Sequence, residues 1–266
     1  MRHTKPMRVP FVVALAVIAI AVTNNCGDDE DDRVANTAFE NASVVRGGQL
    51  YDKWWAVPGV LDPVEPTSGN PGYALTAGTR TGSDTWRCKE CHGWDYRGSE
   101  GAYAQGSSRY TGVMGLLHAS GEDPPDELFG AIRNGIPSTG MSSFSTHLSD
   151  ADVWDIVKFI KQGIIDESQL IDGATRTPIG ADPARGQSRF SSTCAACHGS
   201  DGRLLNFGTD LEPEYVGTVA VENPWEFLHK VRFGQPGAAM PSAIDAGWSV
   251  QDVVDVLGYA QALPTE

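Results

Sequence analysis

Two short cysteine–histidine motifs are the residues of this chain best suited to carry chemistry. Two cysteines separated by two residues are followed directly by a histidine at Cys88–His92 and again at Cys194–His198. Thiols at this spacing can each form a thioether bond to one haem, and the adjacent imidazole then faces the iron from the same side. The predicted cofactors are therefore two covalently attached haem c groups, bound by Cys88, Cys91, His92, Cys194, Cys197 and His198.

Two other uses of the cysteine pairs fit the sequence less well. A zinc site could draw on both pairs, but motifs about a hundred residues apart imply one cofactor each. A disulfide within each pair would make a thioredoxin-like redox centre, yet neither motif lies in a strand–helix–strand pattern. Haem attachment is therefore the favoured prediction.

The two motifs belong to a unit that occurs twice in the chain. Residues 132–141 and 231–240 share the pattern aliphatic-R-x-G-x-P-x-x-x-M without a gap. Before each motif, residues 46–51 and 185–190 share R-G-x-x-x-aromatic. Self-similarity over this many features indicates a duplicated unit, so the same helices are expected around each motif.

Capping boxes and hydrophobic periodicity predict helices and no strands. The last helix of each unit begins at a Ser-x-x-Asp box, at Ser149 and at Ser249. Gly258 in the second of these helices would permit a close helix crossing. The positions predicted to form the buried stripes of these two helices are Val153, Ile156, Val157 and Ile160, and Val253, Val254 and Leu257. The predicted fold class is all-α.

Each unit resembles a class I cytochrome c domain, over roughly residues 44–266. In that family the first and last helices cross near a glycine and an aromatic residue. The motif histidine is one axial iron ligand, and a methionine on a Pro-containing loop is the other. The resemblance implies two ligand pairs, His92 with Met141 and His198 with Met240. The weaker candidates, none of which has a counterpart in the other repeat, are Met114, His118, His147 and His229.

The resemblance implies two tandem class I cytochrome c domains, at 44–165 and 182–266, joined by a linker at 166–181. The first domain departs from the pattern by a long insertion of Gly, Pro and aromatic residues at about 52–85. A loop wrapped over its own domain and anchored by aromatic side chains is the favoured interpretation. A docking surface, or a cover over one haem edge, is the alternative.

The first 25 residues have the layout of an export signal. Arg2, Lys5 and Arg8 precede an apolar run, Phe11 to Val22, that is too short to span a bilayer comfortably. Export agrees with the haem motifs, because c-type haem is attached outside the cytoplasm in the organisms whose proteins this chain resembles. The expected location is the periplasm or the cell envelope.

Cys26 follows the apolar run and opens a segment, 26–43, that is predicted to be an acidic tether. Acylation of Cys26 after cleavage would anchor the protein to a membrane. The preceding Thr23-Asn24-Asn25 fits the usual small-residue lipobox poorly. Simple secretion and an uncleaved anchor therefore stay open as alternatives.

The net negative charge of the chain limits the kinds of partner that it is expected to bind. The chain has a formal net charge of −14 at pH 7, which argues against binding to nucleic acid or to an anionic membrane surface. Redox partner proteins with a basic docking face are expected instead. Arg133 and Arg232, just before the methionine loops, are equally compatible with pairing to a haem propionate and with bracing the loop.

The expected function is electron transfer by an exported dihaem cytochrome that is not itself an enzyme, alone or as the cytochrome subunit of an oxidoreductase. Two strong axial ligands leave no open coordination position on the iron, which suits a carrier of single electrons. The alternative is a dihaem enzyme, such as a peroxidase or a sulfur-compound oxidase, with one exchangeable haem site. Some thiosulfate-oxidising enzymes use a cysteine ligand, and the only spare cysteine here is Cys26.

Overall fold

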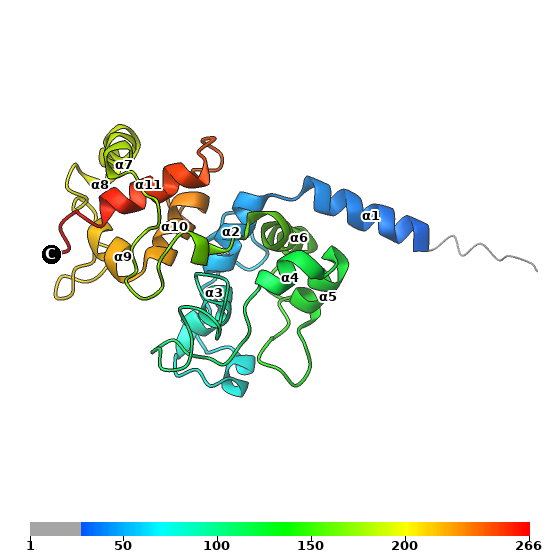
Figure 1. The fold of residues 1–266 in the computed structure, drawn as a ribbon. Coiled ribbons are helices and arrows are strands. Elements are labelled where there is room, and N and C mark those ends of the chain that lie inside the picture. The colour runs from blue at the N-terminus through cyan, green and yellow to red at the C-terminus, as the bar shows by residue number, and fades with distance from the viewer. Residues whose placement is uncertain (1–27) are drawn as a thin grey trace, which may run out of the picture.

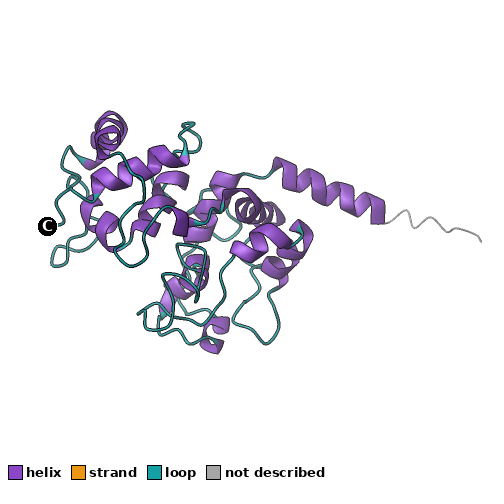
Figure 2. Ribbon diagram, in the orientation of Figure 1, coloured by secondary structure: helices purple, strands orange, loops and turns teal. Residues whose placement is uncertain are grey.

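The computed structural model describes residues 28–266. All the secondary-structure elements assigned within that range are helices or helical turns, and none is a strand (Figures 1 and 2). The predicted all-α fold class is therefore confirmed. The predicted export signal, 1–25, and Cys26 lie outside the described residues. No helix within residues 28–266 is long and apolar enough to cross a membrane.

The repeat divides the described helices into two groups, which we call unit 1 (44–165) and unit 2 (182–266). Unit 1 contains α2 (Val44–Lys53), α3 (Cys88–His92), α4 (Leu117–Glu122), α5 (Pro125–Asn134) and α6 (Asp150–Lys158), which a π-helical turn, η4 (Phe159–Gly163), continues. Unit 2 contains α7 (Pro183–Arg189), η6 (Phe190–Cys194), α8 (Ala195–His198), α9 (Val216–Glu222), α10 (Pro224–Phe233) and α11 (Val250–Ala260). The insertion holds three 3-10 turns, η1 (Trp54–Ala56), η2 (Pro71–Leu75) and η3 (Gly82–Trp86).

In each unit the first and last helices cross at a glycine. A Cβ atom on Gly47 of α2 would collide with the backbone carbonyl of Asp155 in α6, and one on Gly186 of α7 would collide with that of Asp255 in α11. Only glycine permits so close an approach. The arginine before each glycine pairs with the same aspartate, in the ion pairs Arg46–Asp155 and Arg185–Asp255.

Gly258 lies beside the start of the crossing helix rather than at the closest point of the crossing. A Cβ atom on Gly258 would meet the Cβ of Ala181 at 2.7 Å and the Cγ of Pro183, the first residue of α7, at 3.7 Å. The crossing lies at Gly186 because the register of α7 on α11 brings that residue against Asp255.

The last helix of each unit forms as predicted. The hydroxyls of Ser149 and Ser249 accept from the backbone N–H three residues later, and the aspartate there accepts from the serine N–H, which satisfies two otherwise unpaired donors in each helix. The predicted stripes are buried in two separate hydrophobic cores, one for each unit. Burial of these aliphatic faces supplies the main stabilisation of both units.

The segment expected to be an acidic tether forms a helix instead, α1 (Asp28–Asn41). Its second half packs on unit 1: the Phe39 ring lies 6.3 Å from that of Trp154, and the Lys158 ammonium lies 4.4 Å from the Phe39 ring centroid. Ala35, Ala38 and Ala42 also pack against the first core. The second half of α1 is therefore part of the fold of unit 1, whereas its first half projects away from the other helices (Figure 1).

The linker is also packed against the fold. Ile171 is fully buried in the second core, and the 3-10 turn η5 (Glu167–Gln169) precedes it. Glu167 is buried too, and neither carboxylate oxygen has a hydrogen-bond partner among the described residues. Burial raises the pKa of Glu167 well above its usual value.

The two units share an interface, with α10 of unit 2 beside α2 of unit 1 (Figure 1). Phe233 of α10 belongs to the first core, whereas Trp94 and Tyr103 of unit 1 belong to the second. The buried Asp52 carboxylate pairs with Lys230 and with Arg87. Burial alone would raise the pKa of Asp52, but these two cations hold it below its usual range.

His229 of α10 is completely buried at the centre of this interface. Its Nε2–H donates to the Gly48 carbonyl at 2.9 Å, and its Nδ1 accepts from the Tyr96 hydroxyl at 2.8 Å. Both ring nitrogens are thus satisfied in the neutral tautomer. Burial lowers the pKa of His229 to about 3.

His229 is expected to make the protein less stable below about pH 6.5. Between that pH and about 3 the unfolded chain protonates this ring while the folded protein does not. The free energy of unfolding then falls by about 1.4 kcal/mol for each pH unit. Urea unfolding measures this effect. Between pH 7 and pH 5 the free energy of unfolding should fall by about 2 kcal/mol more for the unaltered chain than for His229→Gln. Equal losses of stability in both proteins would contradict the assignment of this pH dependence to His229.

Candidate functional site

The first cysteine–histidine motif coincides with α3. Cys88 and Cys91 form no disulfide, and both thiols are partly buried. The His92 Nδ1–H donates to the backbone carbonyl of Met114 at 2.9 Å. This bond fixes the ring and leaves the Nε2 lone pair free for a metal. Burial lowers the pKa of His92, which favours the neutral imidazole that iron binds.

The second motif, in η6 and α8, is more open. Cys194 is partly buried and Cys197 is exposed, and neither forms a disulfide. The Phe207 ring packs edge-on at 5.7 Å from the ring of His198. The His198 Nδ1 is buried and has no partner among residues 28–266, in contrast to the Nδ1 of His92.

The loop that leaves each motif has the same backbone in both units. Gly93 and Gly199 both adopt φ of +80°, where glycine is favoured. The carbonyl of the motif histidine accepts from the N–H of Gly98 in unit 1 and of Leu204 in unit 2, at 2.9 Å in both. This shared loop was not predicted from the sequence, although His-Gly-x-Asp-x-Arg occurs at both motifs.

Both methionine loops fold alike. Gly135 and Gly234 have positive φ, and a Cβ atom there would lie only 2.7 Å and 2.6 Å from the carbonyl oxygens of Met141 and Met240. These glycines therefore let each loop turn back towards its helix. Both methionine side chains are half-buried, and each packs at the edge of the core that also holds a motif cysteine, as the pairs Cys88 with Met141 and Cys194 with Met240.

The weaker ligand candidates have other surroundings. The Met114 side chain is 72% exposed, and only its backbone carbonyl contacts His92. His118 lies on the surface, and His147 Nδ1 lies 2.9 Å from Asp62 Oδ2 between two tryptophan rings. His229 is bonded at the interface between the units. No three His, Cys, Asp or Glu side chains among residues 28–266 gather into a metal-binding group.

The insertion packs on the methionine loop of unit 1. The Gly72 N–H donates to Ser142 Oγ at 3.1 Å, and the Ser142 hydroxyl donates to Asn70 Oδ1 at 2.5 Å. Trp54 and Tyr73 are buried, as expected for aromatic anchors. The insertion is thus both a wrap over its own unit and a cover on the loop that carries Met141.

Arg133 and Arg232, which precede the two methionine loops, have different surroundings. The Arg133 Nε lies 2.7 Å from Asp150 Oδ1 on the surface, where it braces α5 against α6. Arg232 is buried and donates to the Gly163 carbonyl at 2.5 Å, but its Nη1 has no partner among the described residues.

Unpaired buried donors provide a test of whether haem fits. Buried polar groups normally have partners, so unpaired donors indicate acceptors that bind there. Haem propionates are strong acceptors, and one such donor is Nη1 of Arg232, the residue just before the loop that carries Met240. Together with the free thiols of both motifs and the free Nε2 of His92, this donor fits haem.

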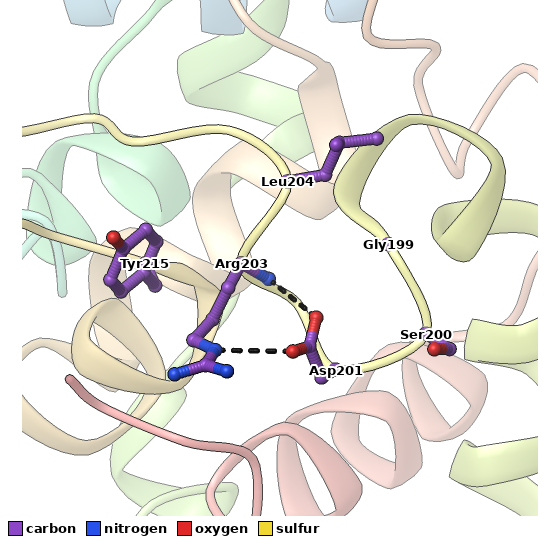
Figure 3. Close-up of a pocket in the computed structure, with 6 residues that line it drawn as sticks. All are labelled: Gly199, Ser200, Asp201, Arg203, Leu204 and Tyr215. Atoms are coloured by element: carbon purple, nitrogen blue, oxygen red, sulfur yellow. Dashed lines mark hydrogen bonds and ion pairs between the residues drawn. The ribbon is translucent and has the colours of Figure 1, made fainter.

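A hollow beside the second motif is lined by Gly199, Ser200, Asp201, Arg203, Leu204 and Tyr215 (Figure 3). Its one arginine is already engaged. The Arg203 Nε lies 3.1 Å from Asp201 Oδ2, and its Nη1 donates to the Glu266 carbonyl at 2.7 Å. The hollow therefore offers no unpaired cation for an anionic ligand.

Comparison with known proteins gives the family. Residues 75–160 and 181–259 match the family described as "Cytochrome C oxidase, cbb3-type, subunit III". The chain belongs to this cytochrome c family. Membership implies covalently bound haem c and an electron-transfer role, which agrees with the geometry of both motifs. The two matched segments correspond to the two units of the repeat.

One curated relative is the "Gluconate 2-dehydrogenase cytochrome c subunit" of Pantoea cypripedii. It is 32% identical over 130 aligned residues, and the match covers 42% of this chain and 29% of the relative. The chain thus matches less than a third of that relative's length. No solved structure matches the chain.

Proposed function

We propose that this cytochrome carries two haem c groups and passes single electrons between redox partners outside the cytoplasm. The proposed haem domains are 44–165 and 182–266. The axial ligand pairs are His92 with Met141 and His198 with Met240. The observation that carries the proposal is that each hydrophobic core holds both a motif cysteine and the loop methionine of the same unit.

Haem held by a histidine and a methionine would supply a one-electron centre with no free ligand position for a substrate. The residues of the chain set its surroundings. The Met114 carbonyl orients the His92 ring, and the positive-φ glycines of the methionine loops hold Met141 and Met240 at the core edge. Partial burial limits water access to each centre, which tunes its potential.

A dihaem enzyme with one exchangeable haem site is the second candidate. The unpartnered Nδ1 of His198 and the exposed Cys197 make the second motif the place where such a site would lie. The methionine loop is nevertheless built the same way in both units, which supports two closed centres and a carrier.

The partners are proposed to be redox proteins, with no role for nucleic acid. The name of the Pantoea relative supports a dehydrogenase as one partner, with this chain as its cytochrome subunit. The proposed location is the periplasm or the cell envelope, with acylated Cys26 as a membrane anchor.

Haem counting tests the proposal. The chain, exported from cells able to attach c-type haem, should carry two haems by intact mass and by optical haem quantification. Cys88→Ala with Cys91→Ala should remove one haem and leave the other, as should Cys194→Ala with Cys197→Ala, because each pair holds its own haem. A single haem in the unaltered chain would contradict the dihaem assignment.

A further inference from the structure

The loop after the first motif is covered by unit 2. Trp94 and Tyr96 in this loop are only 1% and 0% exposed. The His229 ring of α10 lies 4.9 Å from the ring of Trp94, and its Nδ1 accepts from the Tyr96 hydroxyl. Helix α10 of unit 2 therefore packs on the loop next to the haem motif of unit 1.

The equivalent loop of unit 2 has no such cover. The matched hydrogen bonds from Gly98 and Leu204 align the two loops, which places Ser200 and Gly202 where unit 1 has Trp94 and Tyr96. Beyond them lies an exposed apolar stretch, which we call the open loop (204–214), at the outer edge of unit 2 beside the C-terminus (Figure 1). Its exposed apolar residues are Leu204, Leu205, Phe207 and Leu211, which is 93% exposed.

A head-to-tail contact between similar units explains this asymmetry. Such a contact uses two different faces, so the last unit of a row keeps one face free. Unit 1 uses its motif loop to bind unit 2, and the same loop of unit 2 is then the unused face. Exposed apolar patches of this kind mark interaction sites.

Charge indicates what would cover the open loop. At the covered face of unit 1, the buried acid Asp52 is matched by Lys230 of α10. On the open loop, Asp210 and Glu212 are exposed, and neither forms an ion pair with any described residue. A partner that presents apolar side chains ringed by lysine or arginine would complement both features.

We infer that the open loop is the docking site for a basic redox partner protein. This inference rests on the proposed function. The Phe207 ring lies against the ring of His198, so a partner on this loop sits next to the second motif. The second haem, rather than the first, is then the one that exchanges electrons with the partner.

The test measures binding of a lysine-ringed monohaem cytochrome c to the haem-loaded full chain at low ionic strength. Leu211→Ser should weaken binding about tenfold through lost apolar contact, and Glu212→Lys should weaken it about tenfold by charge reversal. Leu61→Ser and Glu122→Lys change exposed residues of the same types in unit 1 and should leave the affinity unchanged.

Three results would overturn the inference: unchanged affinity in both open-loop variants, equal losses in the control variants, or self-association of the chain that Leu211→Ser abolishes. The last result would mean that a second copy covers the loop. Haem content measured on the same samples separates this failure from failure of the proposed function, because only the latter predicts a chain without two haems.

Discussion

Replacing Met240 with histidine is expected to lower the potential of one haem by on the order of 0.2 V, within the roughly 0.8 V that axial ligands span. A thioether sulfur favours reduced iron, whereas a second imidazole does not. The haem should stay attached, because Cys194 and Cys197 are unchanged. An optical redox titration of the haem-loaded protein measures the shift.

Met114→His is the matched control for this substitution. The Met114 side chain is exposed and only its carbonyl contacts His92, so both potentials should stay within a small fraction of the Met240→His shift. Met141→His should lower the potential of the other haem by a similar amount. An unchanged potential in Met240→His would remove Met240 from the ligand set.

Alanine at Gly186 is expected to destabilise the protein by about 3 kcal/mol, a large part of the 5–15 kcal/mol typical of a domain. The new Cβ would collide with the Asp255 carbonyl at the crossing of α7 and α11. Backbone cannot move aside as a flexible side chain can, so the two helices must separate. Urea unfolding of the haem-loaded protein, followed by far-UV circular dichroism, measures the loss.

Gly130→Ala provides the control for the Gly186 change. Gly130 lies within α5, and a Cβ atom there would meet nothing within 4 Å. The substitution should stabilise the protein by about 0.5–1 kcal/mol, because alanine loses less conformational entropy in a helix. If Gly186→Ala unfolded at the same urea concentration as the unaltered chain, the close crossing would not exist in solution.

The features that could be predicted from the sequence are those that occur in both copies of the repeat. Both capping boxes, the two buried stripes and the all-α class come from local spacing, which a single chain displays directly. The crossing at Gly47 and Gly186 also follows a repeated pattern. The exact neighbours of Gly258, Ala181 and Pro183, could not be predicted, because a glycine in an amphipathic helix does not reveal which residue approaches it.

The interface between the units could not be predicted, because it breaks the repeat. His229 aligns with Gly130 of unit 1, so the two equivalent helix faces carry different residues and have different neighbours. Its partners, Gly48 and Tyr96, lie more than a hundred positions away in the chain. Contacts at such separations leave no local pattern.

Helix α1 could have been predicted from the spacing of its apolar residues. Ala35, Ala38, Phe39 and Ala42 fall at i, i+3, i+4 and i+7, the spacing of one helical face. The acidic run before them, Asp28 to Asp32, dominated the interpretation and suggested a solvated tether. Charge at one end of a segment does not exclude packing at the other.

Carbon monoxide binding tests the central claim, two closed His/Met haem centres, most directly. The reduced, haem-loaded chain should bind no carbon monoxide, because both axial positions of each iron are taken. The oxidised protein should show the weak far-red absorption band of methionine–sulfur ligation. Carbon monoxide binding, or the lack of that band, would mean that at least one iron is open or differently ligated, and a dihaem enzyme would then be favoured over a carrier.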